Sequence, residues 1–326
     1  MEPAATIPRE LSDLDDVTAR PVGARRLVRW RRAATRPRAP GEPRRIAYLY
    51  LLPAFAVYLA FVIGPLLHGV WLSFFRWDGI TEGSWVGLRN YTDAVDSSLV
   101  RSEFLHAGVL VFFYAILPVA FGLLLVAAMS RVGTRALGSF RTVIFLPQVI
   151  ATVVVAVTWR WIYAPDGPLN QLLEAVGLGS LTHAWLGDYG LALPAVGLIG
   201  TWITFGLCLV LFSAAIQQIP QSLFDAARVD GAGPVREFFA VTLPGLRNPL
   251  AVALSLTVIG ALRTFDLIYL TTKGGPGRTT MVPSLDIYLK AFVKGEVGSA
   301  AALGVILTLL IFVVTLCITR LVEVRA

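Results

Sequence analysis

The chain has 326 residues, of which 56% are hydrophobic and only 15% are charged. Soluble domains carry about 25% charged residues, so this composition excludes a water-soluble globular protein and indicates a chain that is solvated by lipid. Lys and Arg outnumber Asp and Glu by 28 to 21. However, 11 of the 28 are arginines in the first 45 residues, beside an apolar segment, so the positive net charge does not predict binding to nucleic acid.

The first 45 residues differ in composition from the rest of the chain. They are rich in Arg, Pro and acidic residues, which predicts a disordered cytoplasmic tail. The apolar run over residues 46–75 is much longer than the apolar region of about 7–15 residues in a cleavable signal peptide. We therefore expect a tail at residues 1–45, an uncleaved first membrane span, and a membrane domain at residues 46–326.

Six apolar stretches are long enough to cross a bilayer, which needs about 20 residues. They are residues 46–75, 104–129, 143–163, 191–216, 249–270 and 300–319. Several contain or adjoin a proline, which a membrane helix tolerates when neighbouring helices satisfy the freed backbone groups. The sequence therefore predicts an all-α integral membrane protein with six transmembrane helices packed in a bundle.

The distribution of basic residues predicts the orientation of these helices. If the N-terminal tail is cytoplasmic, the inner segments hold 19 Lys and Arg and the outer connections hold 7, so we expect both the N- and C-termini in the cytoplasm. The last outer connection, residues 271–299, departs from the rule because it contains four of these seven basic residues. In this orientation the connection over residues 217–248 faces the cytoplasm.

Local signals in this cytoplasmic connection predict a helical hairpin. Ser222, followed three residues later by Asp225, fits the start of a short helix. Asp230 and Gly231 form a stop signal, since glycine suits a left-handed position at a helix end, and Pro234 suits the first turn of a second helix. Such a hairpin could simply cover the ends of the spans, or its small and apolar residues could form a surface for a partner protein.

The hairpin also carries a spaced set of small, acidic and aromatic residues. They are Asp225, Ala226, Ala227, Asp230, Gly231, Phe238, Leu243 and Pro244. This set resembles the EAA signature of permease subunits in bacterial ABC importers, with Asp225 where that family usually has Glu. The resemblance implies that the hairpin contains a coupling helix, which docks on a separate cytoplasmic ABC ATPase dimer.

A second pattern lies further along the chain, where residues 265–271 read FDLIYLT and residues 274–276 read GGP. It resembles carbohydrate-uptake permeases of the binding-protein-dependent type, in particular the maltose- and glycerol-phosphate-type first permease. The resemblance covers residues 46–322 and implies a multi-pass subunit of the bacterial inner membrane that imports a mono- or oligosaccharide, or a related polyol or glycerol phosphate. It also implies three partners: a second permease subunit that completes a heterodimer, the ATPase dimer, and an extracytoplasmic sugar-binding protein.

The sequence contains no motif for ATP binding or for catalysis. A P-loop needs Gly-Lys-Ser/Thr, whereas the three lysines, Lys273, Lys290 and Lys294, are followed by Gly, Ala and Gly. The three histidines are too far apart in the sequence to predict a metal site. We therefore expect no catalytic residue, metal or cofactor in this chain, and we expect the partner ATPase to use ATP and Mg²⁺.

Arg263 and Asp266 are ionisable residues in the fifth predicted span, where charges are costly and are candidates for function. They are three residues apart, which predicts that they lie on one helical face, close enough to pair. One interpretation is a structural ion pair that fixes the helix in the bundle. The other is that both residues line the translocation pathway, together with Tyr269. The sequence leaves both interpretations open.

Two other functions compete with a carbohydrate importer. An ABC importer for a different solute would carry the same coupling hairpin. An ion-driven secondary transporter would work without an ATPase, but it would be expected to show membrane carboxylates and paired interrupted helices in two related halves. The six predicted spans offer Asp266 as the one plausible intramembrane acid, and the chain shows no clear internal repeat.

Overall fold

The structure, a computed structural model, describes the backbone of residues 44–129 and 137–322. The predicted tail at residues 1–45 therefore lies outside the described residues, except for Arg44 and Arg45 at the start of the first helix. The chain divides into two compact units, residues 1–58 and 59–326. In the described part of the first unit, helix α1 extends over Arg44–Tyr58.

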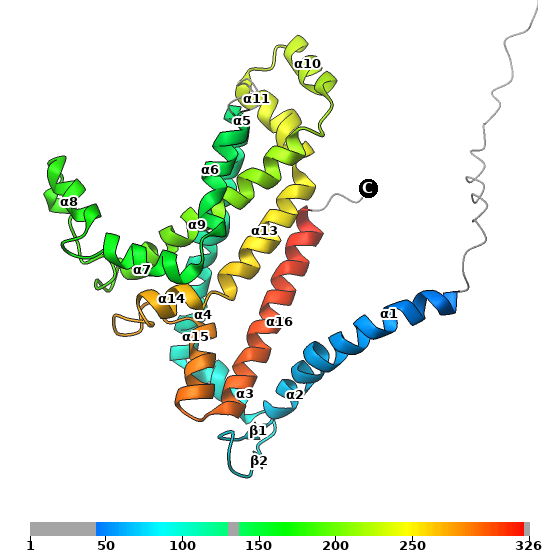
Figure 1. The fold of residues 1–326 in the computed structure, drawn as a ribbon, viewed down its shortest axis with the longest axis vertical. Coiled ribbons are helices and arrows are strands. Elements are labelled where there is room, and N and C mark those ends of the chain that lie inside the picture. Colours follow the sequence, from blue (N-terminus) through cyan, green and yellow to red (C-terminus); the bar gives the residue numbers. More distant parts are fainter. Residues whose placement is uncertain (1–43, 130–136, 323–326) are drawn as a thin grey trace, which may run out of the picture. The chain divides into compact units, whose positions relative to one another are not determined.

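The described part of the second unit consists of helices, their connections and one small β-hairpin (Figure 1). Its α-helices are α2 (Gly64–Leu72), α3 (Arg89–Asp96), α4 (Ser98–Val111), α5 (Leu117–Met129), α6 (Leu137–Val149), α7 (Thr152–Ile162), α8 (Pro168–Ala175), α9 (Ala192–Ile216), α10 (Gln221–Val229), α11 (Pro234–Glu237), α12 (Leu243–Gly245), α13 (Arg247–Leu262), α14 (Asp266–Thr271), α15 (Pro283–Tyr288) and α16 (Val297–Val322). Short π-helical turns occupy Leu59–Ile63, Phe112–Ile116, Phe238–Thr242 and Leu289–Val293, and a 3₁₀ turn occupies Gly179–Leu181. Strands β1 (Phe75–Arg76) and β2 (Ser84–Trp85) pair antiparallel, with Phe75 opposite Trp85.

Four helices in the described part of the chain are long and apolar enough to cross a membrane. They are Tyr48–Leu72, Ser98–Ala128, Ala192–Ile216 and Val297–Leu321. Two bent pairs could each form one further span, namely Arg141–Val149 with Thr152–Ile162, bent by 99°, and Pro234–Gly245 with Arg247–Leu262, bent by 72°. The predicted all-α membrane fold is confirmed. The prediction of six spans matches the count obtained when each bent pair is taken as one span.

Two of the predicted spans are not continuous helices. The third, residues 143–163, is interrupted after Val149, and Ala151 before α7 has a non-helical ψ of 134°. The fifth, residues 249–270, ends as a helix at Leu262, and α14 is a separate short helix. The prediction of one unbroken fifth span is therefore wrong.

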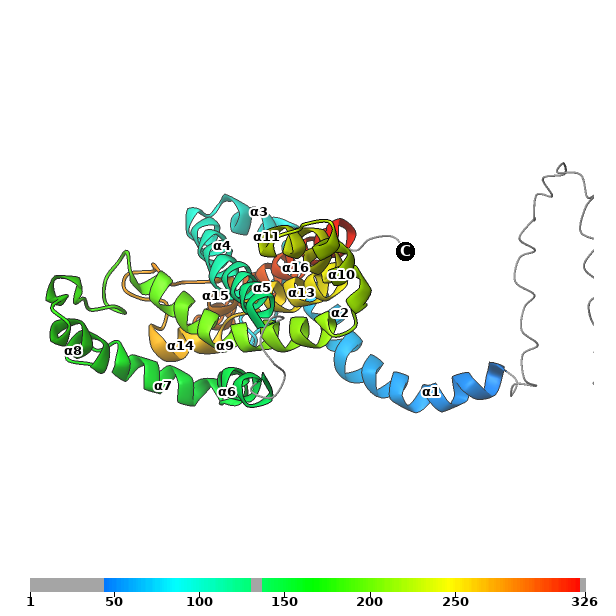
Figure 2. The same ribbon diagram turned by 90° about the horizontal axis from the view of Figure 1, so that it is seen from above.

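Helix α9 lies at the centre of the second unit, where it packs against α4, α5, α6 and α13 (Figure 2). Glycines on α9 allow close approach of its neighbours. A Cβ atom on Gly200 would overlap the ring of Tyr114, and one on Gly206 would overlap the carbonyl oxygen of Ile144. Small residues at such contacts let membrane helices pack backbone to backbone, so these glycines set the spacing of the bundle.

The contact between α9 and the π-helical turn before α5 has a polar basis. Pro118 has no backbone N–H, so the carbonyl of Tyr114 has no helical partner four residues later. The hydroxyl of Thr204 on α9 is shared between that carbonyl oxygen, at 3.2 Å, and the carbonyl oxygen of Gly200, at 2.8 Å. The hydroxyl of Thr201 donates to the carbonyl oxygen of Phe113 at 2.6 Å. Neighbouring helices thus satisfy the groups that a proline frees, as a lipid environment requires.

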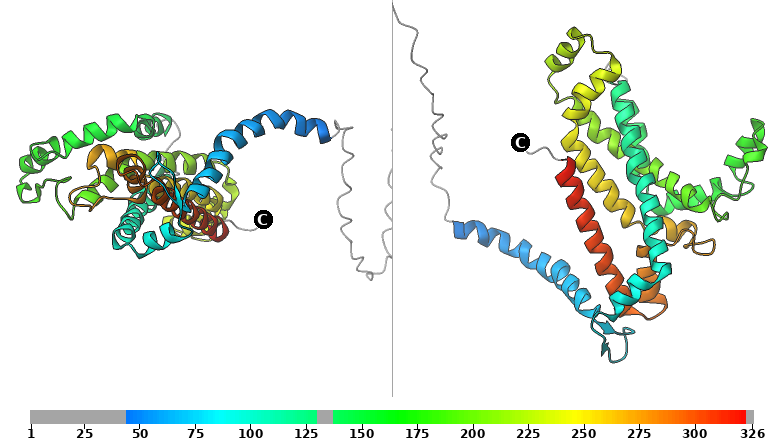
Figure 3. Two further views of the ribbon diagram at one scale, coloured as in Figure 1. Left: turned by 90° about the horizontal axis from the view of Figure 1, so that it is seen from below. Right: turned by 180° about the vertical axis from the view of Figure 1, so that it is seen from behind.

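The two ends of the second unit carry different features. Helices α10 and α11 lie at one end, whereas α3, α15 and the β1–β2 hairpin lie at the other (Figures 1 and 3). Helices α13 and α16 pack side by side between these ends. This arrangement separates the predicted coupling hairpin from the connection after α14.

Candidate functional site

Helix α10 ends in a turn that requires a glycine. Gly231 has a φ of 72°, a left-handed conformation that costs other residues free energy. The amide of Ala232 donates to the carbonyl oxygen of Ala227 at 2.9 Å, which is the Schellman arrangement at a helix end. Pro234 then occupies the first turn of α11. The predicted roles of Gly231 and Pro234 in the backbone are confirmed.

The predicted start of this helix is wrong. Helix α10 begins at Gln221 rather than after Ser222, and no side chain caps it. Pro220 precedes the first helical residue with a φ of −57°, so its ring already fixes the direction of the chain at the helix entry. Ser222 lies within the first turn and is exposed.

Helix α10 is anchored on one side and exposed on the other. Phe224 is buried, whereas Val229 is 87% exposed. Of the predicted coupling residues, Asp225, Ala226, Asp230, Gly231 and Pro244 are exposed, and Ala227, Phe238 and Leu243 are half-buried. Four of the exposed members, Asp225, Ala226, Asp230 and Gly231, lie on α10 and the turn after it, whereas Pro244 lies on α12.

An ion pair that sequence reasoning missed joins α10 to α11. The Nε atom of Arg228 donates to Oε2 of the buried Glu237 at 3.0 Å. The guanidinium of Arg228 also lies 3.6 Å from the carboxylate of Asp225. Arg228 therefore connects an exposed acid of the predicted coupling face to the second helix of the hairpin.

An apolar groove of about 380 Å³ lies beside the hairpin. It is lined by Leu124, Ala127, Ala128, Pro234, Val235, Glu237, Phe238, Phe239 and Thr242. Phe238, which belongs to the predicted coupling set, forms part of its wall and packs edge-to-face with Phe239 at 5.2 Å between ring centroids. The groove therefore connects the hairpin to the C-terminal part of α5.

Arg263 and Asp266 do not lie on one helix. Helix α13 ends at Leu262, and α14 begins at Asp266, so the spacing rule for neighbours on a continuous helix does not apply. Both side chains are exposed, and neither forms an ion pair with any residue that the structure describes. The interpretation as a structural ion pair is wrong. The carbonyl oxygen of Thr264, inside the break, accepts a hydrogen bond from the hydroxyl of Ser284.

Tyr269 belongs to an aromatic cluster next to this break. Its ring stacks on Phe265 at 5.3 Å and meets Tyr288 edge-to-face at 5.4 Å. Phe292 extends the cluster from Tyr288 at 5.5 Å. Tyr269 is half-buried, so it is held by packing while part of its surface stays accessible.

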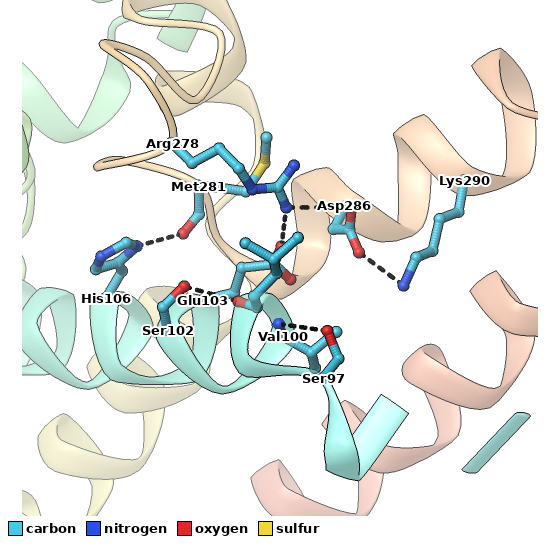
Figure 4. Close-up of polar contacts among 10 residues, drawn as sticks. Ser97, Val100, Ser102, Glu103, His106, Arg278, Met281, Asp286 and Lys290 are labelled. Carbon is cyan, nitrogen blue, oxygen red and sulfur yellow. Dashed lines mark hydrogen bonds and ion pairs between the residues drawn. The ribbon is translucent and has the colours of Figure 1, made fainter. Parts of the chain in front are cut away.

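Glu103 on α4 and three charged residues that follow α14 in the chain, Arg278, Asp286 and Lys290, form a cluster that we call the charge quartet (Figure 4). Arg278 donates to the carboxylate of Glu103 on α4 and lies 3.8 Å from the carboxylate of Asp286 on α15. Lys290 binds the other oxygen of Asp286 at 2.9 Å. The side chain of Glu103 is 0% exposed and that of Asp286 is 3% exposed.

The charge quartet uses two of the four basic residues in the connection over residues 271–299. Arg278 and Lys290 are paired with buried acids, whereas Lys273 and Lys294 are exposed.

A tight turn precedes β2 in the small hairpin. The Oδ1 atom of Asp78 accepts hydrogen bonds from the amides of Ile80 at 2.9 Å and Thr81 at 2.8 Å. These donors favour the ionised carboxylate and hold the pKa of Asp78 below its ordinary value. The hairpin lies against the start of α16, where a Cβ atom on Gly298 would overlap the carbonyl oxygen of Phe75.

Comparison with known proteins gives consistent results. Residues 119–326 match the family described as binding-protein-dependent transport system inner membrane component. The probable ABC transporter permease protein YurN of Bacillus subtilis is 38% identical over 275 residues, which cover 83% of this chain and 94% of that protein. The trehalose/maltose transport system permease protein MalF of Thermococcus litoralis is 33% identical over 280 residues, which cover 83% and 92%.

A solved structure has a similar fold. The crystal structure of a bacterial alginate ABC transporter, in complex with an alginate pentasaccharide-bound periplasmic protein, contains a chain that superposes with a TM-score of 0.71. The two chains are 22% identical, and the match covers 86% of this chain and 96% of that chain. The similarity therefore extends over nearly the whole membrane domain.

Proposed function

Because the chain belongs to the family of binding-protein-dependent transport system inner membrane components, we propose that it forms one half of the translocation pathway of an ABC importer for a carbohydrate. The chain is a multi-pass permease subunit of the inner membrane and is not itself an enzyme. It works in complex with a periplasmic binding protein and other transporter subunits. The family that the sequence resembles is thereby confirmed.

The choice of a carbohydrate rests on the relatives. The Thermococcus protein is a trehalose/maltose permease by name, and the solved transporter is an alginate transporter. The proposed substrate class is a mono- or oligosaccharide, or a related polyol or glycerol phosphate. An ABC importer for a different solute is the second candidate.

The coupling residues are Asp225, Ala226, Ala227, Asp230, Gly231, Phe238, Leu243 and Pro244. We propose that they dock on a separate ABC ATPase dimer, which binds ATP and Mg²⁺. Three features support this proposal: Phe224 anchors α10, the opposite face of α10 is exposed, and Gly231 fixes the turn that follows. A short helix held in this way can transmit a movement of the ATPase to α13 through α11 and α12.

Arg263, Asp266 and Tyr269 are our candidates for residues that line the pathway. Irregular backbone at membrane depth is tolerated where it is buried in protein or lines a water-filled cavity. The break between α13 and α14 exposes Arg263 and Asp266, which favours the second situation. An aromatic ring such as Tyr269 beside polar groups also suits the apolar face and hydroxyls of a sugar.

A second permease subunit would complete the pathway in a heterodimer. Large apolar side chains of α16 are exposed, including Leu309, Phe312 and Leu316, and lipid or a second subunit would cover them. The bias in basic residues supports our proposal that both termini are cytoplasmic.

Reconstitution tests this function against an ion-driven transporter. The chain, its second permease, the ATPase and the binding protein would be placed in proteoliposomes, with labelled maltose and trehalose as the first probes. We expect uptake that requires ATP inside the vesicle and the binding protein outside. Uptake driven by an ion gradient alone, without ATPase or binding protein, would overturn the proposal.

A further inference from the structure

The connection between α14 and α15 is a loop whose two ends are tied together. The hydroxyls of Thr272 and Thr280 are 2.7 Å apart. The hydroxyl of Thr280 also lies 2.8 Å from the carbonyl oxygen of Gly275, and its amide donates to the carbonyl oxygen of Gly274 at 3.3 Å. These contacts close residues 272–280 into a compact unit, which we call the outer loop.

Arg278 connects the outer loop to the helices beneath it. Its guanidinium reaches Glu103 on α4 and Asp286 on α15 (Figure 4). A second contact follows directly, because Nδ1 of His106 on α4 lies 2.8 Å from the carbonyl oxygen of Met281. The orientation of the loop relative to α4 and α15 is therefore fixed by polar contacts at two points.

The charge quartet is a costly way to attach a loop. Burying ionised groups requires desolvation that their attraction often does not exceed, and apolar residues of similar volume commonly hold a structure as well. In addition, Oε2 of Glu103 and Nε of Arg278 are buried without a hydrogen-bond partner among the described residues. The quartet does more than attach the loop to α4 and α15. The planar guanidinium of Arg278 also fixes the orientation of the loop, because its hydrogen bonds have a defined geometry.

We propose that Arg278 is a positioning residue, which Glu103 and Asp286 hold so that the outer loop is a preformed docking surface for the extracytoplasmic binding protein. This inference rests on the proposed function as a subunit of a binding-protein-dependent importer. A surface whose conformation is fixed before binding loses less entropy when a partner docks.

The position and exposure of the outer loop fit this role. It belongs to the part of the second unit that lies away from α10 and α11 (Figure 1). Lys273 and Gly277 in the loop are exposed. A Cβ atom on Gly277 would lie 2.9 Å from the ring of Tyr189 in the connection before α9, so two outer connections meet there and enlarge the surface. Because the guanidinium of Arg278 is engaged with the acids, the exposed Lys273 supplies the positive charge of the loop.

The test compares variants of the complete transporter complex in two measurements. The first is the concentration of binding protein that gives half-maximal stimulation of ATP hydrolysis. The binding protein used is the one that co-purifies with the wild-type complex. The second is amide hydrogen exchange in residues 273–280. For Arg278→Gln we expect faster exchange and a half-saturating concentration raised by about tenfold, which corresponds to about 1.4 kcal/mol of docking free energy. Basal ATP hydrolysis and the maximal stimulated rate should not change.

A charge-swapped variant separates positioning from general stability. In Glu103→Arg combined with Arg278→Glu, the new arginine lies between two carboxylates, those of residues 278 and 286, so the link between α4 and the loop is restored. We expect its half-saturating concentration to return to within about threefold of the wild-type value, or about 0.6 kcal/mol. The matched control is Arg101→Gln, since Arg101 is on α4 and its side chain is exposed; this variant should behave as the wild type.

Each other result overturns the inference. If Arg278→Gln lowers only the yield of complex, while the assembled fraction keeps the wild-type half-saturation, Arg278 has a purely structural role. Faster exchange without a change in half-saturation would mean that docking does not use the loop. If the Arg278→Gln complex does not assemble, the charge-swapped variant provides the test. A raised half-saturating concentration of binding protein in that variant would contradict the proposal that the ion pair between residues 103 and 278 positions the loop. A wild-type complex that no binding protein stimulates would instead refute the proposed function.

Discussion

Gly231 offers a sharp test of the coupling hairpin because its requirement is confined to the backbone. Its φ is 72°, and a Cβ atom at this position would meet no atom within 4 Å. An added Cβ atom therefore causes no clash, and Gly231→Ala acts through the left-handed conformation, which costs an L-residue roughly 1–2 kcal/mol. A β-branched residue such as valine should lie at or above the upper end of this range, since it is a clear outlier at positive φ.

The magnitude follows from this backbone cost. A penalty of 1–2 kcal/mol lowers the population of the native turn, relative to alternatives, by a factor of about 5–30. If docking on the ATPase requires this turn, these factors are the largest expected losses of binding-protein-stimulated ATP hydrolysis, up to about 5-fold for Gly231→Ala and up to about 30-fold for Gly231→Val. Gly231→Asn should be affected least, because asparagine tolerates the left-handed region.

The assay measures stimulated ATP hydrolysis and the amount of ATPase that co-purifies with the permease, both at equal amounts of membrane-inserted protein. The matched control is Gly233→Ser. Gly233 lies two residues away, has a φ of −70°, and a Cβ atom there would also meet nothing within 4 Å; it is the N-cap residue of α11, a position that serine favours. Wild-type coupling in Gly231→Val, or an equal loss in Gly233→Ser, would refute the argument from the left-handed turn.

Three further predictions concern the helical bundle and the β1–β2 hairpin. Gly200→Ala should lower the thermal midpoint of the purified protein, at a cost of about 1–3 kcal/mol for overpacking against Tyr114. Gly304→Ala, inside α16 and with open space around its Cβ, should leave that midpoint unchanged or raise it, because alanine favours a helix more than glycine does. Thr204→Val should destabilise the protein by about 0.6 kcal/mol in a chemical-denaturation experiment, because the carbonyl oxygen of Tyr114 loses its donor. In a carboxyl-carbon NMR titration, Asp78 should protonate below the ordinary value of 3.8. Its ionised form stabilises the turn, so that stabilisation is complete above the ordinary value and is lost as the pH falls through the lowered pKa.

The features that the sequence predicted correctly depend on short segments. The apolar runs that cross the membrane are recognisable from composition because every residue in them faces lipid or another helix. Gly231 and Pro234 act through their own φ angles, so their roles do not depend on distant residues. Ser222 is the instructive failure, because Pro220 just upstream defines the helix entry and leaves no position for a capping side chain.

The polar contacts between distant segments were not predictable in the same way. Arg278 and Glu103 are 175 positions apart in the sequence, and no local pattern brings them together. Two signals did exist. Glu103 directly precedes a predicted apolar span, and the predicted outer connection over residues 271–299 contains four basic residues. An acid that becomes buried in an apolar setting needs a charged partner, and this connection offers several.

The break at residues 263–265 shows how tertiary contacts override local preference in this chain. No Gly or Pro occurs between Ala261 and Lys273, so nothing in the sequence stops the helix there. The structure stabilises the break from outside, because Ser284 donates to the carbonyl oxygen of Thr264 and Phe265 stacks on Tyr269. A bundle gains nothing in stability by interrupting a helix and exposing Arg263 beside it, since lipid does not hydrate charges or free carbonyls. The interruption supports our proposal that the pathway passes this point, and the contact with Phe265 holds Tyr269 beside the break.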